Sequence, residues 1–198
     1  YVGWDGYGQM NITGGTFNAY GITSRTGSSW GDVIISGGTL NVGAGGLSAA
    51  PWFHLNGGTI RATAPFTMNA NTVLINGTTF DTNGNNVVIT SWLQNGGAGG
   101  LVKTGAGTLT LTNSNSYTGG TIVNAGTLSL AANSGYARVG GVLTVNTGAT
   151  VETTGDGTGL GFYDQLTTLN VNGGTATSAG TMHVWNLTGG VNLTGGTL

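Results

Sequence analysis

The sequence contains no cysteine and only two prolines, and it has few charges. The absence of cysteine excludes disulfide bonds. Charged residues make up 5% of the 198 residues, against about 25% in ordinary soluble domains. The net charge is −2, so the chain lacks the basic surface that attracts nucleic acid or anionic membranes. No apolar run approaches the roughly 18 residues of a membrane-spanning helix, and we expect neither a nucleic-acid partner nor membrane insertion of this segment.

Glycine, in contrast, is abundant, with 41 residues. Glycine-rich chains are often disordered. Here 38% of the residues are hydrophobic, which is enough apolar surface to bury a core. We therefore predict a single folded domain over residues 1–198. We expect it to be a segment of a longer repeat protein or fibre, because the final stretch "VNLTGGTL" stops inside a repeat.

A repeat runs along the whole chain. Its anchor is a threonine that follows two small residues, mostly Gly-Gly. The anchors are Thr16, Thr39, Thr59, Thr79, Thr108, Thr127, Thr150, Thr175 and Thr197. They recur about every 23 residues, a period typical of solenoids.

The residues around each anchor alternate in polarity. The residue after the threonine is apolar and the next one is polar, and successive strand residues point to opposite faces. We therefore expect the threonines to form one outward ladder, with an inward core beside it. The expected core residues are Phe17, Leu40, Ile60, Phe80, Leu109, Leu128 and Val151. Arg61 and Asp81 share an outward position in consecutive units, which predicts an ion pair between coils.

This pattern predicts an all-β fold, a parallel β-helix of about nine coils of roughly 22 residues. A β-sandwich of hairpins is the main rival, because Asn-Gly sequences such as Asn76-Gly77 favour two-residue hairpin turns. A sandwich does not require the same inward and outward positions nine times. Stacked coils do, because each residue lies about 4.8 Å above its counterpart.

Residues 100–130 match a known pattern more closely. The matching residues are Leu101, Lys103, Gly105, Gly107, Leu109, Leu111, Asn115, Tyr117, Gly119, Thr121, Gly126 and Leu128. This stretch resembles the autotransporter-associated β-strand repeat, also called the passenger-associated transport repeat. The resemblance implies a right-handed β-helix in an autotransporter passenger domain, exported to the outside or the surface of a bacterial cell. Lys103 has no motif partner and is interpreted as a surface charge.

Catalytic motifs are weak in this sequence. Lys103 precedes its glycines, the reverse of the order in a phosphate-binding P-loop. Glycoside hydrolysis needs two carboxylates facing one bond. The carboxylates are Asp5, Asp32, Asp81, Glu152, Asp156 and Asp164. Asp81 and Glu152 share an outward position, but two intervening coils would separate them by about 14 Å. Asp156 and Asp164 flank a glycine-rich segment and could approach each other.

Metal and cofactor motifs are equally sparse. His54 and His183 lie far apart without a His-x-x-x-His pair, although His183 or Arg138 could lie near the glycine-rich segment. We expect no metal, no cofactor and no catalytic residue, and hence no enzyme. An ice-binding surface would need a flat Thr-x-Thr array, but the position two after the threonine is charged in three units, at Arg61, Asp81 and Glu152.

The sequence thus indicates an extracellular structural protein, a β-helical stalk, fibre or adhesin segment that could assemble end to end. The alternative is a β-helix that binds or cleaves carbohydrate. Exposed tryptophans would suit sugar stacking, and host or matrix glycans are the expected partners in that case. Trp30, Trp52 and Trp92 lie at predicted bends or strand ends.

Overall fold

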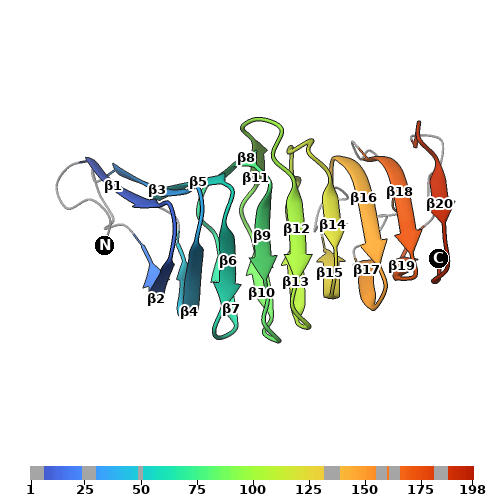
Figure 1. Cartoon of the computed structure of the whole chain (residues 1–198), viewed down its shortest axis with the longest axis horizontal. Coiled ribbons are helices and arrows are strands. Elements are labelled where there is room, and N and C mark those ends of the chain that lie inside the picture. Colours follow the sequence, from blue (N-terminus) through green and yellow to red (C-terminus); the bar gives the residue numbers. More distant parts are fainter. Residues whose placement is uncertain are drawn as a thin grey trace.

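The computed structural model describes residues 7–23, 30–48, 51–131, 139–154, 160, 166–180 and 187–198. Within these ranges the chain is all-β, and its strands stack in parallel as a β-solenoid, as predicted (Figure 1). The described part contains no helix that is long and apolar enough to cross a membrane.

Two sheets form the walls of the solenoid. The smaller sheet, called here the A sheet, has five parallel strands at the N-terminal end of the stack. In spatial order these are β1 (Tyr7–Ile12), β3 (Trp30–Ile35), β5 (Pro51–Asn56), β8 (Thr72–Asn76) and β11 (Leu93–Asn95).

The larger sheet contains two columns of strands. The first column begins with β2 (Thr16–Ile22) and β4 (Thr39–Leu47), and continues through β6 (Thr59–Ala62), β9 (Thr78–Asp81), β12 (Leu101–Thr104), β14 (Thr121–Val123), β16 (Gly141–Asn146), β18 (Leu166–Asn172) and β20 (Val191–Leu193). The second column starts from the end of β4 and contains β7 (Phe66–Met68), β10 (Val87–Ile89), β13 (Thr108–Leu111), β15 (Gly126–Leu130), β17 (Ala149–Thr153) and β19 (Thr175–Ser178). β4 joins the columns because its start pairs with β6 and its end with β7.

The stack has about seven turns of roughly 22 residues, so the prediction of nine coils was too high. That prediction counted one coil for every anchor threonine. Thr16 lies on β2, which pairs only with β4 among the described strands, and Thr197 lies in a single bridge to Thr175. Among the described residues, each of the two outermost anchors therefore has a neighbouring turn on one side only.

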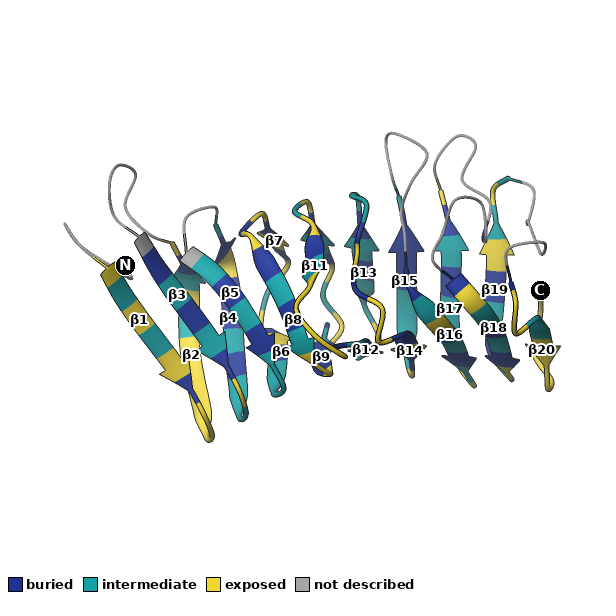
Figure 2. Ribbon diagram, turned by 90° about the horizontal axis from the view of Figure 1, so that it is seen from above, coloured by how far each residue is buried: buried dark blue, intermediate teal, exposed yellow. Residues whose placement is uncertain are grey.

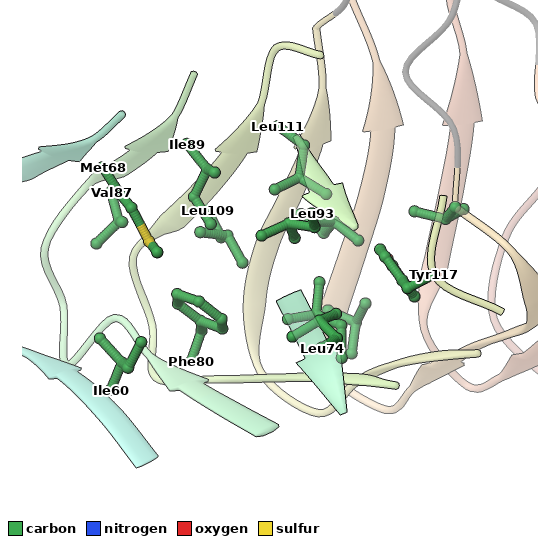
Figure 3. Packing of buried hydrophobic residues seen from close by; sticks show 14 of the residues in the cluster. Ile60, Met68, Leu74, Phe80, Val87, Ile89, Leu93, Leu109, Leu111 and Tyr117 are labelled. Atoms are coloured by element: carbon green, nitrogen blue, oxygen red, sulfur yellow. The ribbon is translucent and has the colours of Figure 1, made fainter. Parts of the chain in front are cut away.

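The core fills the space between the walls. Alternate strand residues point inward and are buried, as the colouring along the strands in Figure 2 shows. Ile60, Phe80 and Leu109 point into the same interior, where they pack with side chains of β7 and β10 (Figure 3). Burial of each such side chain stabilises the fold by about 1.5–3 kcal/mol.

Six of the seven expected core residues lie in this cluster, and one does not. The six are Leu40, Ile60, Phe80, Leu109, Leu128 and Val151. Phe17 was predicted to face inward, but 43% of its surface is exposed. Among the described strands β2 has a neighbour on one side only, so one turn alone packs against it.

Candidate functional site

The anchor threonines form two ladders instead of the single ladder predicted. Thr16, Thr39, Thr59 and Thr79 are register partners in the first column, but the next partner of Thr79 is Val102. The second ladder runs along the other column. Its members are Thr108, Thr127, Thr150, Thr175 and Thr197.

The change of ladder has a geometric cause. Up to Thr79 the glycine bend lies between the A sheet and the first column. From Thr108 onward it lies between the first and second columns, one corner further along the chain. The 29-residue gap between Thr79 and Thr108 therefore contains one turn plus one additional short strand.

The outward surface is held by contacts between turns. Arg61 and Asp81 are register partners, and Arg61 Nε lies 3.3 Å from Asp81 Oδ2. Arg61 also donates to Asn83 Oδ1 at 2.9 Å. The Arg61 side chain is 47% exposed, so this ion pair contributes about 0–1 kcal/mol.

Asparagine amides make further ladders along the solenoid. Asn41 donates to Asn18 at 2.7 Å, and Asn146 donates to Asn124 at 2.7 Å. Asn192 donates to Asn170 at 2.8 Å. Each bond joins residues 22 or 23 positions apart, so the outward polar groups of these ladders bind the neighbouring turn.

The most specific polar cluster surrounds Lys103 at the end of β12. Its side chain points inward because Lys103 follows buried Leu101 by two residues, and it is 0% exposed. Its ammonium donates to the carbonyls of Thr104 (2.9 Å), Gly105 (2.7 Å) and Ala125 (2.9 Å), and to Thr82 Oγ1 (3.0 Å). These acceptors belong to three successive turns. We call Lys103 and these four acceptors the lysine clamp.

The lysine clamp corrects the interpretation of Lys103 as a surface charge. Burial lowers the pKa of the Lys103 ammonium to about 8, and nearby Asp81 opposes this shift. A buried charge is tolerated only when its hydrogen bonds are satisfied. Here an ammonium with three N–H groups meets four oxygen acceptors. The i, i+2 spacing from Leu101 was the sequence signal that could have placed Lys103 inside.

Glycines allow the bends around the clamp to stack closely. Gly105 has a φ of 77°, in the left-handed region that favours glycine. Gly107 has no such φ, but a Cβ there would overlap the Asn85 carbonyl group of the preceding turn. The bend from Gly105 to Gly107 thus needs glycine for two different physical reasons.

The matched stretch also contains buried side chains with polar groups outside the lysine clamp. Tyr117 is 0% exposed, and its hydroxyl lies 2.7 Å from Thr121 Oγ1. Asn115 Oδ1 accepts a hydrogen bond from the Leu93 backbone N–H at 3.0 Å, and its amide donates to the Asn113 carbonyl at 3.1 Å. Asn115 thus binds the edge of the A sheet where that sheet ends, since Leu93 lies on β11, its last strand.

The carboxylates with described positions lie on different strand columns. Asp32 is on the A sheet, Asp81 on the first column and Glu152 on the second column. Asp81 and Glu152 therefore do not share an outward position, contrary to the prediction. Asp32 Oδ1 lies 3.3 Å from His54 Nε2, and Asp32 also accepts a hydrogen bond from Tyr7.

Several residues considered from the sequence lie outside the described ranges. They are Asp5, Arg138, Asp156, Asp164 and His183. Over the ranges that the structure does describe, no three His, Cys, Asp or Glu side chains gather as a metal site would require.

Comparison with known protein families gives a match for the stretch that contains most of the lysine clamp. Residues 101–130 match the model of the passenger-associated transport repeat. This match and the β-solenoid fit an autotransporter passenger domain with such repeats. Repeats of this family are generally non-catalytic, and they imply a secreted or cell-surface protein. Searches of curated proteins and of solved structures gave no match.

Proposed function

We propose that this chain is a structural segment of an extracellular passenger, a β-helical stalk that spaces or supports other parts of a surface protein. The observation that carries the proposal is the continuity of the stack, in which the asparagine ladders and the lysine clamp bind neighbouring turns. Seven turns at about 4.8 Å each make a rod of about 34 Å.

The same geometry supports assembly end to end. Parallel strands at the end of a solenoid present unpaired backbone groups that favour further strand pairing. Leu193 on β20 is 52% exposed, whereas its register partner on the preceding turn, Val171, is fully buried. In the fibre version of this function, a second copy of the chain packs against that strand.

Carbohydrate cleavage is the weaker candidate. It needs two carboxylates within about 10 Å of each other. Asp32, Asp81 and Glu152 lie on three different strand columns, so these three do not favour such a pair.

Electron microscopy and sedimentation velocity of the purified chain over a range of concentrations test the proposal. Elongated particles are expected in either version, and filaments that lengthen with concentration would support the fibre. Leu193→Lys should then abolish growth, because it places a charge on the end strand. Val142→Lys is the matched control, since Val142 is also exposed but lies on β16 inside the stack. Compact, isometric particles would contradict the structural role.

A further inference from the structure

A polar hollow lies at one corner of the solenoid, beside the most accessible described tryptophan. Its volume is about 260 Å³. Its lining residues are Asn69, Asn71, Ser91, Trp92, Gln94 and Asn113. They come from the bend between β7 and β8, from the bend between β10 and β11 with the start of β11, and from the segment after β13.

The repeat brings these residues together on adjacent turns. Leu93 is the register partner of Thr72, so the preceding residue, Trp92, lies beside Asn71. Gln94 is the partner of Val73 on the same two strands. Trp92 is 58% exposed, so its indole is open to solvent at the edge of the hollow.

Most of the polar side chains that line the hollow have no hydrogen-bond partner among the described residues. The side chains of Asn69, Asn71 and Gln94 make no hydrogen bond to any described residue. Ser91 Oγ is buried without a hydrogen-bond partner. Asn113, in contrast, is fixed, because it donates to the Thr90 carbonyl and accepts from the Ser114 backbone N–H.

The chemistry of the lining selects one class of ligand. The lining contains amides and a hydroxyl but no charged side chain, which disfavours phosphate, sulfate and carboxylate groups. Each amide offers two donors and one acceptor, which matches hydroxyl groups that both donate and accept. The apolar face of a sugar ring stacks on an exposed indole, whose N–H remains available for a hydrogen bond.

We propose that Trp92 and the surrounding amides form a binding site for one unit of a neutral oligosaccharide. The volume is slightly below the roughly 300–1,000 Å³ of small-molecule pockets, which suits a single sugar ring with its neighbours outside. Trp92 supplies the stacking platform, and Asn71, Gln94 and Asn113 supply the hydrogen bonds. The site goes beyond the structural role, since a stalk requires no such hollow.

Isothermal titration with cellohexaose, laminarihexaose and mannohexaose tests the site, with an oligogalacturonide as the anionic probe. The indole N–H signals of the full chain are followed by NMR in parallel. We expect at least one neutral hexasaccharide to bind with a Kd of about 1 mM or lower. The Trp92 indole signal should shift, and the anionic probe should not bind.

Two variants with a matched control complete the test. Trp92→Ala and Asn71→Ala should each weaken binding at least tenfold, and both replace exposed side chains. Tyr20→Ala is the control, because Tyr20 is an aromatic side chain with 79% exposure on β2, at the N-terminal end of the described stack and away from the hollow. Circular dichroism checks that each variant folds. Binding of none of the neutral probes, equal binding of the anionic probe, or unchanged affinity in Trp92→Ala would each overturn the proposal.

Discussion

Replacement of Lys103 by methionine tests whether the lysine clamp holds three turns together. Methionine keeps most of the apolar stem, so the change removes the ammonium and leaves little cavity. The carbonyls of Gly105 and Ala125 and the Thr82 hydroxyl then lose a charged donor. The Thr104 carbonyl keeps its bond from the Thr82 backbone N–H.

The expected loss follows from two opposing effects. Removal of a buried charge relieves its desolvation cost, and apolar replacements of buried ions are sometimes neutral for this reason. Here the Gly105 and Ala125 carbonyls and the buried Thr82 hydroxyl remain in the bends without the donor that Lys103 supplied. At roughly 1 kcal/mol for each lost hydrogen bond, we expect Lys103→Met to lower the free energy of unfolding by about 3 kcal/mol.

Urea unfolding followed by circular dichroism measures this loss. Arg61→Met is the matched control, because it removes an exposed cation from the same region, and it should cost less than about 1 kcal/mol. If Lys103→Met proved as stable as the wild type, or if both variants lost the same amount, the clamp would not be a stabilising element.

The remaining predictions concern protonation and backbone contact. The pKa of Lys103 is about 8 in the folded chain and 10.5 ordinarily, so between these pH values the unfolded chain binds more protons and this group makes stability rise with pH. The rise should appear in wild-type urea midpoints and vanish in Lys103→Met; equal slopes would refute it. Gly107→Ala should cost more than about 3 kcal/mol in thermal or urea unfolding, because its Cβ would overlap a backbone carbonyl. Gly14→Ala should be nearly neutral, since that position faces open space, and similar losses in the two variants would contradict the close approach.

The matched repeat lies where the architecture changes. It begins at β12, which in the first column is the neighbour of β9, the strand where the first threonine ladder ends at Thr79. Within it the A sheet gives way to the Asn115–Tyr117 segment, and the glycine bend moves to the next corner. At this junction Lys103 and Asn115 hydrogen-bond to neighbouring turns, in addition to the apolar packing and the ladders that run through the rest of the stack.

The strand periodicity and most of the core could be predicted from the amino-acid sequence. On any strand, successive side chains point to opposite faces, so alternating apolar and polar residues show which face is inside. Leu40, Ile60 and Leu128 could therefore be placed inside without knowledge of their neighbours. The period of about 22 residues likewise indicated a stack of similar turns.

Which strands lie above one another depends on the tertiary structure and could not be predicted from the repeat pattern. The sequences around Thr79 and Thr108 resemble each other, but their bends lie at different corners of the solenoid. The corner depends on the number of strands in the turn between the two threonines. The same is true of Lys103 and Phe17. Lys103 lies inside because bends of three turns offer oxygens to its ammonium. Phe17 stays partly exposed because, among the described strands, a turn covers it on one side only. Both conditions are set by contacts between residues more than 20 positions apart.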